Sequence, residues 1–312
     1  MLELNFCPVC SWEFKGNLPR MIPYPTKRGE AIAHKPDQIF FCDNCGIGIA
    51  IPLPSSEEME KYYSVGDFWG IAQPHILAPK KHPIPYALAL SRWRILEPFL
   101  KESQRRISIL DIGAGHGFLG MTAAQSKTVK LWKYVCVEKD RFLRESMKKT
   151  WSLRFPHIEL DVKDDISQVH GTFDCLILSH ILEHLSNPLS DLKIMLTKLN
   201  PKSLVFIDVP NQDYLFKKDV FPHFYFFSES SLHHLMNASG LHILSITGYG
   251  NDINQSSLNF RNAGKLKTRL GNLIIRMKWL LPEKLTISLF SEYFAMDKKN
   301  ENGIWIRGVG QS

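Results

Sequence analysis

The stretch "ILDIGAGHGFLG", Ile109 to Gly120, decides the fold of this chain, because its glycines allow two interpretations. Gly115, Gly117 and Gly120 spell G-x-G-x-x-G, the pattern that dinucleotide-binding folds place between a strand and a helix. Read from Asp111, the same stretch spells D-x-G-x-G-x-G. The first pattern predicts NAD or FAD and redox chemistry, whereas the second predicts S-adenosylmethionine (SAM) and methyl transfer. Both need a strand, a tight turn and a helix, so the loop alone does not decide between them.

Strands and helices alternate along the chain from this stretch onward. Such alternation is typical of parallel strands joined by helices. The sequence therefore predicts an α/β fold with a doubly wound, mostly parallel seven-stranded sheet, preceded by a helix from Tyr86 to about Lys101. Residues 251–302 would form a helical insertion before the last strand. The predicted strands are 107–112, 133–140, 157–162, 173–179, 203–209, 241–250 and 304–310, and the predicted helices after the glycine loop are 118–127, 141–151, 188–199 and 228–240.

The carboxylate of Asp111 favours SAM over a dinucleotide. It ends a strand two positions before Gly113, where it would repel a pyrophosphate of like charge. Beside the sulfonium and ammonium groups of SAM the same carboxylate is favourable, and the following helix offers amides to the methionine carboxylate. Glu138 ends the next strand and can accept hydrogen bonds from both ribose hydroxyls, a feature that suits NAD and SAM equally.

Two later segments carry a resemblance to a known family. They are the "LEHL-x-NP" motif at Leu182 to Pro188 and the "PN…H…FS…L" motif that starts at Pro210. With the glycine loop they make residues 107–249 resemble a class I SAM-dependent methyltransferase, which implies a Rossmann-like sheet. More loosely, an N-terminal cysteine domain before such a fold resembles bacterial sugar methyltransferases and proteins of surface-polysaccharide clusters.

The resemblance implies the residues that bind SAM. Asp111, Gly113 and Gly115 would contact the methionine part, and Glu138 the ribose. The adenine amino group would be held by Asp164, or else by Asp165, although a solvated turn is an equal interpretation of that pair. The full set of expected cofactor residues is Asp111, Gly113, Ala114, Gly115, Gly117, Glu138, Lys139, Asp164, Asp165 and Ser179.

Three histidines are candidates for the catalytic base, because a hydroxyl acceptor gains from a base with a pKa near neutrality. They are His180, His184 and His223. His184 could instead pack or cap a helix, or bind a divalent ion with Glu183 and His180. Some quinone-precursor O-methyltransferases have a similar E-x-x-E-H segment, but here His180 replaces its first Glu. The motifs of nucleobase amino- and cytosine C5-methylating enzymes are missing, which leaves O-methylation or C-methylation of an activated carbon.

Four of the six cysteines form the pairs "CPVC" and "CDNC". Two such pairs can complete a closed tetrahedral site, so we expect a structural Zn²⁺ in a zinc-ribbon-like domain at residues 1–55. A redox pair and two unrelated pairs are the alternatives. Cys136 and Cys175 lie in apolar strand patterns and are predicted core thiols. The expected zinc ligands are Cys7, Cys10, Cys42 and Cys45.

Charge and hydropathy limit the remaining function classes. The net charge is +7, a mild basic excess that permits an anionic partner without requiring one. The N-terminus lacks a signal-peptide pattern and no apolar run approaches the roughly 18–20 residues of a membrane helix, so we expect a cytoplasmic protein. Basic residues flank an apolar stripe in 261–281. This segment is expected to cap the site, with peripheral membrane contact as the alternative.

The sequence thus predicts a zinc domain (1–55), a linker with leading helices (56–106) and a SAM-dependent methyltransferase domain (107–312). The expected acceptor is a small molecule, foremost a sugar hydroxyl of a nucleotide- or lipid-linked glycan in polysaccharide biosynthesis. No specific nucleic-acid partner is expected. The competing hypotheses are an RNA methyltransferase with a zinc module, a non-catalytic SAM-fold binding module and an NAD-dependent oxidoreductase. The pattern does not indicate an oligomeric state.

Overall fold

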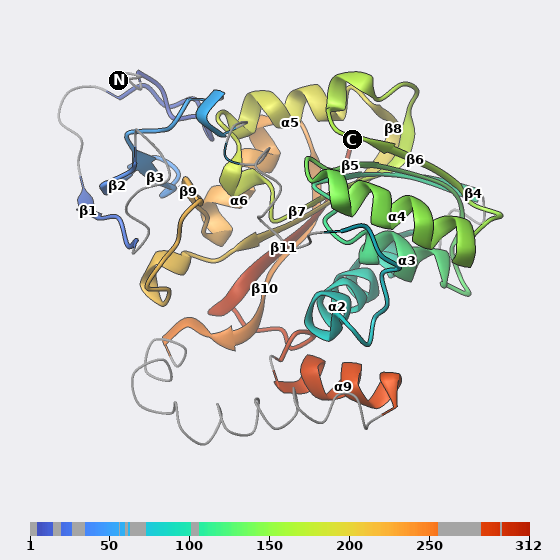
Figure 1. Cartoon of the computed structure of the whole chain (residues 1–312). Coiled ribbons are helices and arrows are strands. Elements are labelled where there is room, and N and C mark those ends of the chain that lie inside the picture. Colours follow the sequence, from blue (N-terminus) through green and yellow to red (C-terminus); the bar gives the residue numbers. More distant parts are fainter. Residues whose placement is uncertain are drawn as a thin grey trace.

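A seven-stranded sheet forms the centre of the molecule (Figure 1). The computed structural model describes residues 5–14, 20–26, 35–55, 57–59, 62, 73–100, 106–254, 282–293 and 295–312. From β6 to β8 the neighbouring strands are parallel, whereas β11 runs antiparallel to β8 and to β10. The predicted fold class is confirmed. The strand order is β10 (His242–Asp252), β11 (Gly303–Gln311), β8 (Leu199–Pro210), β7 (Phe173–Ser179), β4 (Arg106–Ile112), β5 (Lys130–Val137) and β6 (Glu159–Lys163).

Helices cover both faces of this sheet because alternate strand residues point to opposite sides. In β4, Ile107 and Ile109 join the core under one set of helices, whereas Leu110 and Ile112 join the core on the opposite face. The first face carries α2 (Pro83–Leu100), α3 (Phe118–Ala124), α4 (Arg141–Arg154) and α9 (Glu283–Tyr293). The second carries α5 (Pro188–Leu196), α6 (Glu229–Ala238) and the N-terminal module.

The sheet changes direction of winding at β4, whose neighbours are β5 on one side and β7 on the other. Ligands of open α/β sheets bind at such a point, beyond the carboxyl ends of the strands. The loops that follow β4, β5, β6, β7 and β8 therefore meet at one edge of the sheet, and these loops hold the residues singled out in the sequence.

The N-terminal module contains a small antiparallel sheet. Its strands are β1 (Met21–Pro23), β2 (Gln38–Phe41), β3 (Gly48–Ile51) and β9 (Tyr225–Phe226). The last of these belongs to the loop between β8 and α6 of the large domain, and Ile49 pairs with Tyr225. The predicted boundary at residue 55 is therefore crossed by a strand pairing, and the module shares its core with α5 and α6.

The basic segment 261–281 lies outside the described residues, so its expected capping or membrane role stays a prediction. Within the described part of the chain, every helix is too short or too polar to cross a membrane.

Candidate functional site

The glycine loop after β4 has a backbone that side chains disfavour. Gly113, Gly115 and Gly117 have φ angles of 68°, 54° and 65°, in the left-handed region that glycine tolerates best. A Cβ on Gly113 would lie 1.9 Å from Cδ1 of Ile181, in the loop after β7. The amide of Gly113 donates to the carbonyl of Val137 at 2.8 Å, which ties the loop to β5. The loop after β4 and the loop after β7 are thus in direct contact, as the strand order requires.

Asp111 lies beneath this loop, buried on the face of the sheet that α3 covers. Its Oδ2 accepts a 2.6 Å hydrogen bond from the hydroxyl of Tyr134, whereas Oδ1 has no hydrogen-bond partner among the described residues. Burial raises the pKa of Asp111 to about 7, against the opposing effect of the Tyr134 hydrogen bond. The sequence led us to expect a direct contact with the methionine part of SAM. This expected contact stays a prediction.

Glu138 connects the first two loops of the site. Its Oε2 accepts a 2.7 Å hydrogen bond from the amide of Gly115, and its Oε1 accepts one of 2.9 Å from the amide of Asp140. Burial raises the pKa of Glu138, and these amide hydrogen bonds oppose the shift. The carboxylate is therefore at the carboxyl end of β5, where the sequence placed it, and it also fixes the glycine loop.

The two acidic candidates after β6 differ in their environment. The Oδ1 of Asp165 caps a short 3-10 helix by accepting from the amide of Ser167 at 2.9 Å, and its Oδ2 lies 3.2 Å from Lys139 Nζ. These hydrogen bonds lower the pKa of Asp165, the capping bond most. In contrast, Oδ1 of Asp164 is buried without a hydrogen bond in the described structure. Asp164 is therefore the carboxylate better able to accept a new donor. At the end of β7, the hydroxyl of Ser179 is likewise buried without a described hydrogen-bond partner.

His180 follows β7 and stands between two buried carboxylates. Its Nδ1 lies 3.1 Å from Oε1 of Glu183, and its Nε2 lies 3.7 Å from Oδ2 of Asp208. The φ angle of His180 is 55°, a left-handed conformation that costs a non-glycine residue on the order of 1–2 kcal/mol. Its side chain keeps 31% of its surface exposed, the largest exposed fraction among the three candidate histidines.

His184 and His223 form an inner pair with less exposed side chains, at 16% and 13%. Their rings meet edge to face, with centroids 4.8 Å apart. Nδ1 of His184 lies 2.9 Å from the carbonyl of Pro222, and Nδ1 of His223 lies 2.8 Å from Oδ2 of Asp213. Burial lowers the pKa of His184 to about 4, although the nearby Glu183 carboxylate opposes that shift.

His180, His184 and His223 form a histidine cluster together with two buried carboxylates, Glu183 and Asp213. Burial alone would raise the pKa of Glu183, but His180, His184 and His223 around it lower the pKa below its usual value. The same competition lowers the pKa of Asp213, where His223 and Lys217 outweigh burial. The cluster therefore holds fixed negative charge beneath the histidines. Asp213, the carboxylate partner of His223, could not be predicted from the sequence, because it lies ten residues away on a separate turn.

Asp208 near the carboxyl end of β8 belongs to a network that the sequence did not reveal. It is fully buried, and its oxygens lie 2.5 Å from Nε of Arg92 on α2 and 3.4 Å from Nε of Arg307 on β11. These two guanidinium groups lower the pKa of Asp208 against the effect of burial. Nη2 of Arg307 has no hydrogen bond among the described residues. Because its partners come from distant elements, this network follows only from the folded arrangement.

Comparison with known proteins places the site in a family. Residues 82–246, more than half of the chain, match the family model described as "Methyltransferase domain". The chain belongs to this family. Its residues 82–246 are accordingly a SAM-dependent methyltransferase domain, and the competing interpretation of the glycine loop as an NAD site is set aside.

Individual relatives of this methyltransferase are distant. A 116-residue stretch is 27% identical to the mitochondrial ubiquinone biosynthesis O-methyltransferase of Saccharomyces cerevisiae; it covers 36% of each chain, about a third of that relative's length. A SAM-dependent methyltransferase structure from Archaeoglobus fulgidus aligns over 73% of this chain and 94% of its own, with 16% identity and a TM-score of 0.45. Magnesium protoporphyrin IX methyltransferase of Synechocystis, with bound SAH, aligns over 62% and 93%, with 14% identity and a TM-score of 0.47.

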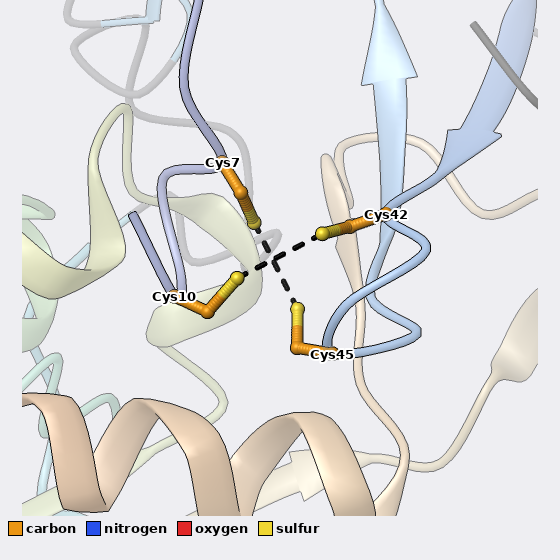
Figure 2. A group of neighbouring side chains, drawn as sticks. All are labelled: Cys7, Cys10, Cys42 and Cys45. Carbon is orange, nitrogen blue, oxygen red and sulfur yellow. Dashed lines mark hydrogen bonds between the residues drawn. The ribbon is translucent and has the colours of Figure 1, made fainter. Parts of the chain in front are cut away.

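The four cysteines of the N-terminal module converge on one point (Figure 2). Their sulfur atoms lie 3.8 Å apart for Cys7 and Cys45, and 3.7 Å apart for Cys10 and Cys42. A tetrahedral Zn²⁺ with Zn–S bonds of about 2.3 Å has ligands about 3.8 Å from one another, so the four thiols have the spacing of a zinc site. The positive φ of Gly46, 73°, supports the second knuckle turn. Cys136 and Cys175 are buried in the sheet, as predicted.

The module also holds the loop that carries His223. The Tyr24 hydroxyl donates to the carbonyl of His223 at 2.9 Å, and the amide of Ala50 donates to the carbonyl of Phe224 at 2.8 Å. From the other side, the amide of Phe224 donates to the carbonyl of Glu183 at 2.7 Å. The cysteine module is therefore connected directly to the histidine cluster, a link that the sequence analysis did not predict.

Proposed function

We propose that this protein transfers a methyl group from SAM to a hydroxyl oxygen of a small-molecule acceptor. One observation carries the proposal. The strained and partly exposed His180 lies immediately before Ile181, whose side chain touches the glycine loop at Gly113. A histidine beside the cofactor loop can serve as the base for an oxygen acceptor.

The residues around the glycine loop fit SAM. The positive φ angles of Gly113, Gly115 and Gly117 favour glycine, so the loop has a bare backbone that a ligand can approach, and Asp164 offers a buried oxygen without a described hydrogen bond. Glu138 would hold the ribose, with Ala114, Lys139 and Ser179 lining the same edge. When bound, SAM supplies an electrophilic methyl group, whose bond to sulfur breaks with the electron pair as the bond to the acceptor oxygen forms.

His180 would take the proton of the attacking hydroxyl. The carboxylates of Glu183 and Asp208, 3.1 and 3.7 Å from its two ring nitrogens, stabilise the imidazolium that results. Catalysis would come mainly from alignment of the acceptor and the methyl group, to which proton transfer adds about 100- to 10,000-fold.

We infer further that the acceptor is a sugar of a nucleotide- or lipid-linked glycan, used in the cytoplasm for polysaccharide biosynthesis. An N-terminal cysteine domain before this fold resembles the arrangement in bacterial sugar methyltransferases, and this resemblance supports the proposal. The four cysteines would hold a structural Zn²⁺, because their spacing fits a closed thiolate site. That ion would fix the module without entering the reaction.

The test uses the full chain and SAM with a labelled methyl group. Nucleotide sugars, lipid-linked glycans and RNA are offered separately as acceptors. We expect label on a sugar, reduced at least 100-fold by His180→Asn and unchanged by His233→Asn on the exposed surface of α6. Label on RNA alone would favour the RNA hypothesis. Equal rates for the two histidine variants at every pH would refute the assignment of His180.

A further inference from the structure

We propose that Glu183, His184 and His223 bind a divalent transition-metal ion beside the acceptor. One ligand atom from each of these residues lies within 4.8 Å of the others. Glu183 and His184 come from the short 3-10 helix after β7 (Leu182–His184), and His223 comes from the loop before β9. Two imidazoles and one carboxylate are a ligand set that binds Zn²⁺ and related ions in proteins.

Both histidines are oriented as metal ligands usually are. The carbonyl of Pro222 only accepts hydrogen bonds, so Nδ1 of His184, at 2.9 Å, must carry the hydrogen. The carboxylate of Asp213 does the same for Nδ1 of His223 at 2.8 Å. In the neutral rings, Nε2 of each histidine is then the nitrogen with the lone pair. Metal-binding histidines commonly have such a carbonyl or carboxylate behind them, which fixes the tautomer and the ring.

Glu183 is the second, independent indication of a ligand. The side chain is completely buried, yet neither carboxylate oxygen accepts a hydrogen bond of good geometry from the described residues. Its nearest contacts are the imidazole nitrogens of His180 at 3.1 Å and His184 at 3.9 Å. A buried carboxylate without hydrogen bonds is costly, and a bound cation removes that cost.

Three protein ligands leave a coordination position open, which is typical of catalytic zinc and unlike the closed four-cysteine site. His180 contacts the Glu183 carboxylate, so an ion there would lie next to the proposed base, and Asp208 would then be the carboxylate that stabilises the imidazolium of His180. The open position would receive an acceptor oxygen. This part rests on the proposed function and favours acceptors with two neighbouring hydroxyls, one bound to the ion and one methylated. Metal binding itself is independent of any acceptor.

The decisive experiment counts zinc ions in the full chain. The protein is loaded with Zn²⁺, dialysed and analysed by mass spectrometry of its metals. We expect about two zinc ions per chain in the wild type, one in the cysteine site and one in the histidine site. Glu183→Gln and His223→Asn should each retain about one, whereas the matched surface variant His233→Asn should retain two. Circular dichroism and SAM binding by calorimetry confirm that each variant is folded.

Cobalt substitution shows which site is lost. Thiolate ligands give Co²⁺ intense charge-transfer absorption, which the histidine–carboxylate site lacks. Glu183→Gln should keep the thiolate absorption and lose one Co²⁺ per chain. A wild-type protein that binds SAM but holds a single metal ion would overturn this inference and leave the proposed methyl transfer standing. Retention of two ions by both variants would also overturn it.

Discussion

The contact between Gly113, in the glycine loop after β4, and Ile181, in the loop after β7 that also carries His180, can be tested by mutation. Gly113→Ala would place a Cβ 1.9 Å from Cδ1 and 2.6 Å from Cγ1 of Ile181. Gly171→Ala is a matched control. Gly171 also has a positive φ, 89° against 68°, but its new Cβ would meet nothing within 4 Å. The two substitutions therefore share the backbone strain and differ in the clash.

The expected magnitudes follow from these two effects. An alanine in the left-handed region costs about 1–2 kcal/mol, so both variants should lose that much stability. Forcing a methyl group into a packed contact costs about 1–3 kcal/mol more at Gly113. The loop after β7 can relieve the clash by moving Ile181 and His180 away from the glycine loop. We therefore expect the free-energy cost of the clash to weaken SAM binding by about 5- to 150-fold. Gly171→Ala should bind SAM like the wild type.

The assay is calorimetric titration with SAM, combined with urea unfolding of each variant. The double variant Gly113→Ala with Ile181→Ala removes the clashing atoms while keeping the backbone strain. It should regain most of the lost affinity. If Gly113→Ala and Gly171→Ala bind SAM within twofold of each other, or if the double variant shows no recovery, the loops are not coupled through this contact.

Two further predictions concern the module and the pH response. Tyr24→Phe removes the hydroxyl that holds the His223 carbonyl at 2.9 Å, which should lower stability by about 1 kcal/mol and lower kcat severalfold with SAM affinity unchanged. Tyr86→Phe is the control, because it removes a hydroxyl hydrogen bond to Gln125 on the opposite face of the large sheet, and it should leave kcat unchanged. Equal effects of the two variants on kcat would contradict the connection between the module and His223. Burial, helped by the charges of His82 and His75, lowers the pKa of His116 to about 4. Between about pH 6.5 and pH 4, His116 is therefore protonated in the unfolded chain but not in the folded protein. The free energy of unfolding should fall by up to about 3 kcal/mol as the pH decreases from 6.5 to 4. Urea unfolding of His116→Gln should show a smaller loss over that range, and an identical pH slope would disprove the assignment.

The sheet could be predicted from sequence because each strand carries a local signal. Apolar residues of β7, "FDCLILS", match the predicted limits, Phe173 to Ser179, since this strand is buried on both faces. The limits of β8 differed more. It begins at Leu199 instead of at 203, because Phe173 pairs with Leu199 across a register shift that only the neighbouring strand reveals. The pairing of β9 with β3 had no local signal at all, since the two strands are far apart in sequence.

The candidate site was predictable where its residues lie in one motif and obscure where partners come from distant elements. The positions of Gly113, Glu138 and His180 at strand ends follow from the glycine motif and the apolar strand patterns around it. Tyr134 beneath Asp111 and Asp213 behind His223 are contacts across elements, which alternation and spacing do not encode. Sequence could thus locate the polar groups at the edge of the sheet, but not which of them hold others in place.

The contacts of the N-terminal module explain why a cysteine domain accompanies this methyltransferase domain. The loop from Phe221 to Phe224 carries His223 and leads into β9, a strand of only two residues. Such a loop has little regular structure of its own, so without other contacts the His223 imidazole would occupy several positions. Strand β3, the Tyr24 hydroxyl and the Ala50 amide supply the missing hydrogen bonds. Metal bound at the four cysteines would fix β2 and β3 through Cys42 and Cys45, and thereby stabilise His223 from outside the catalytic domain.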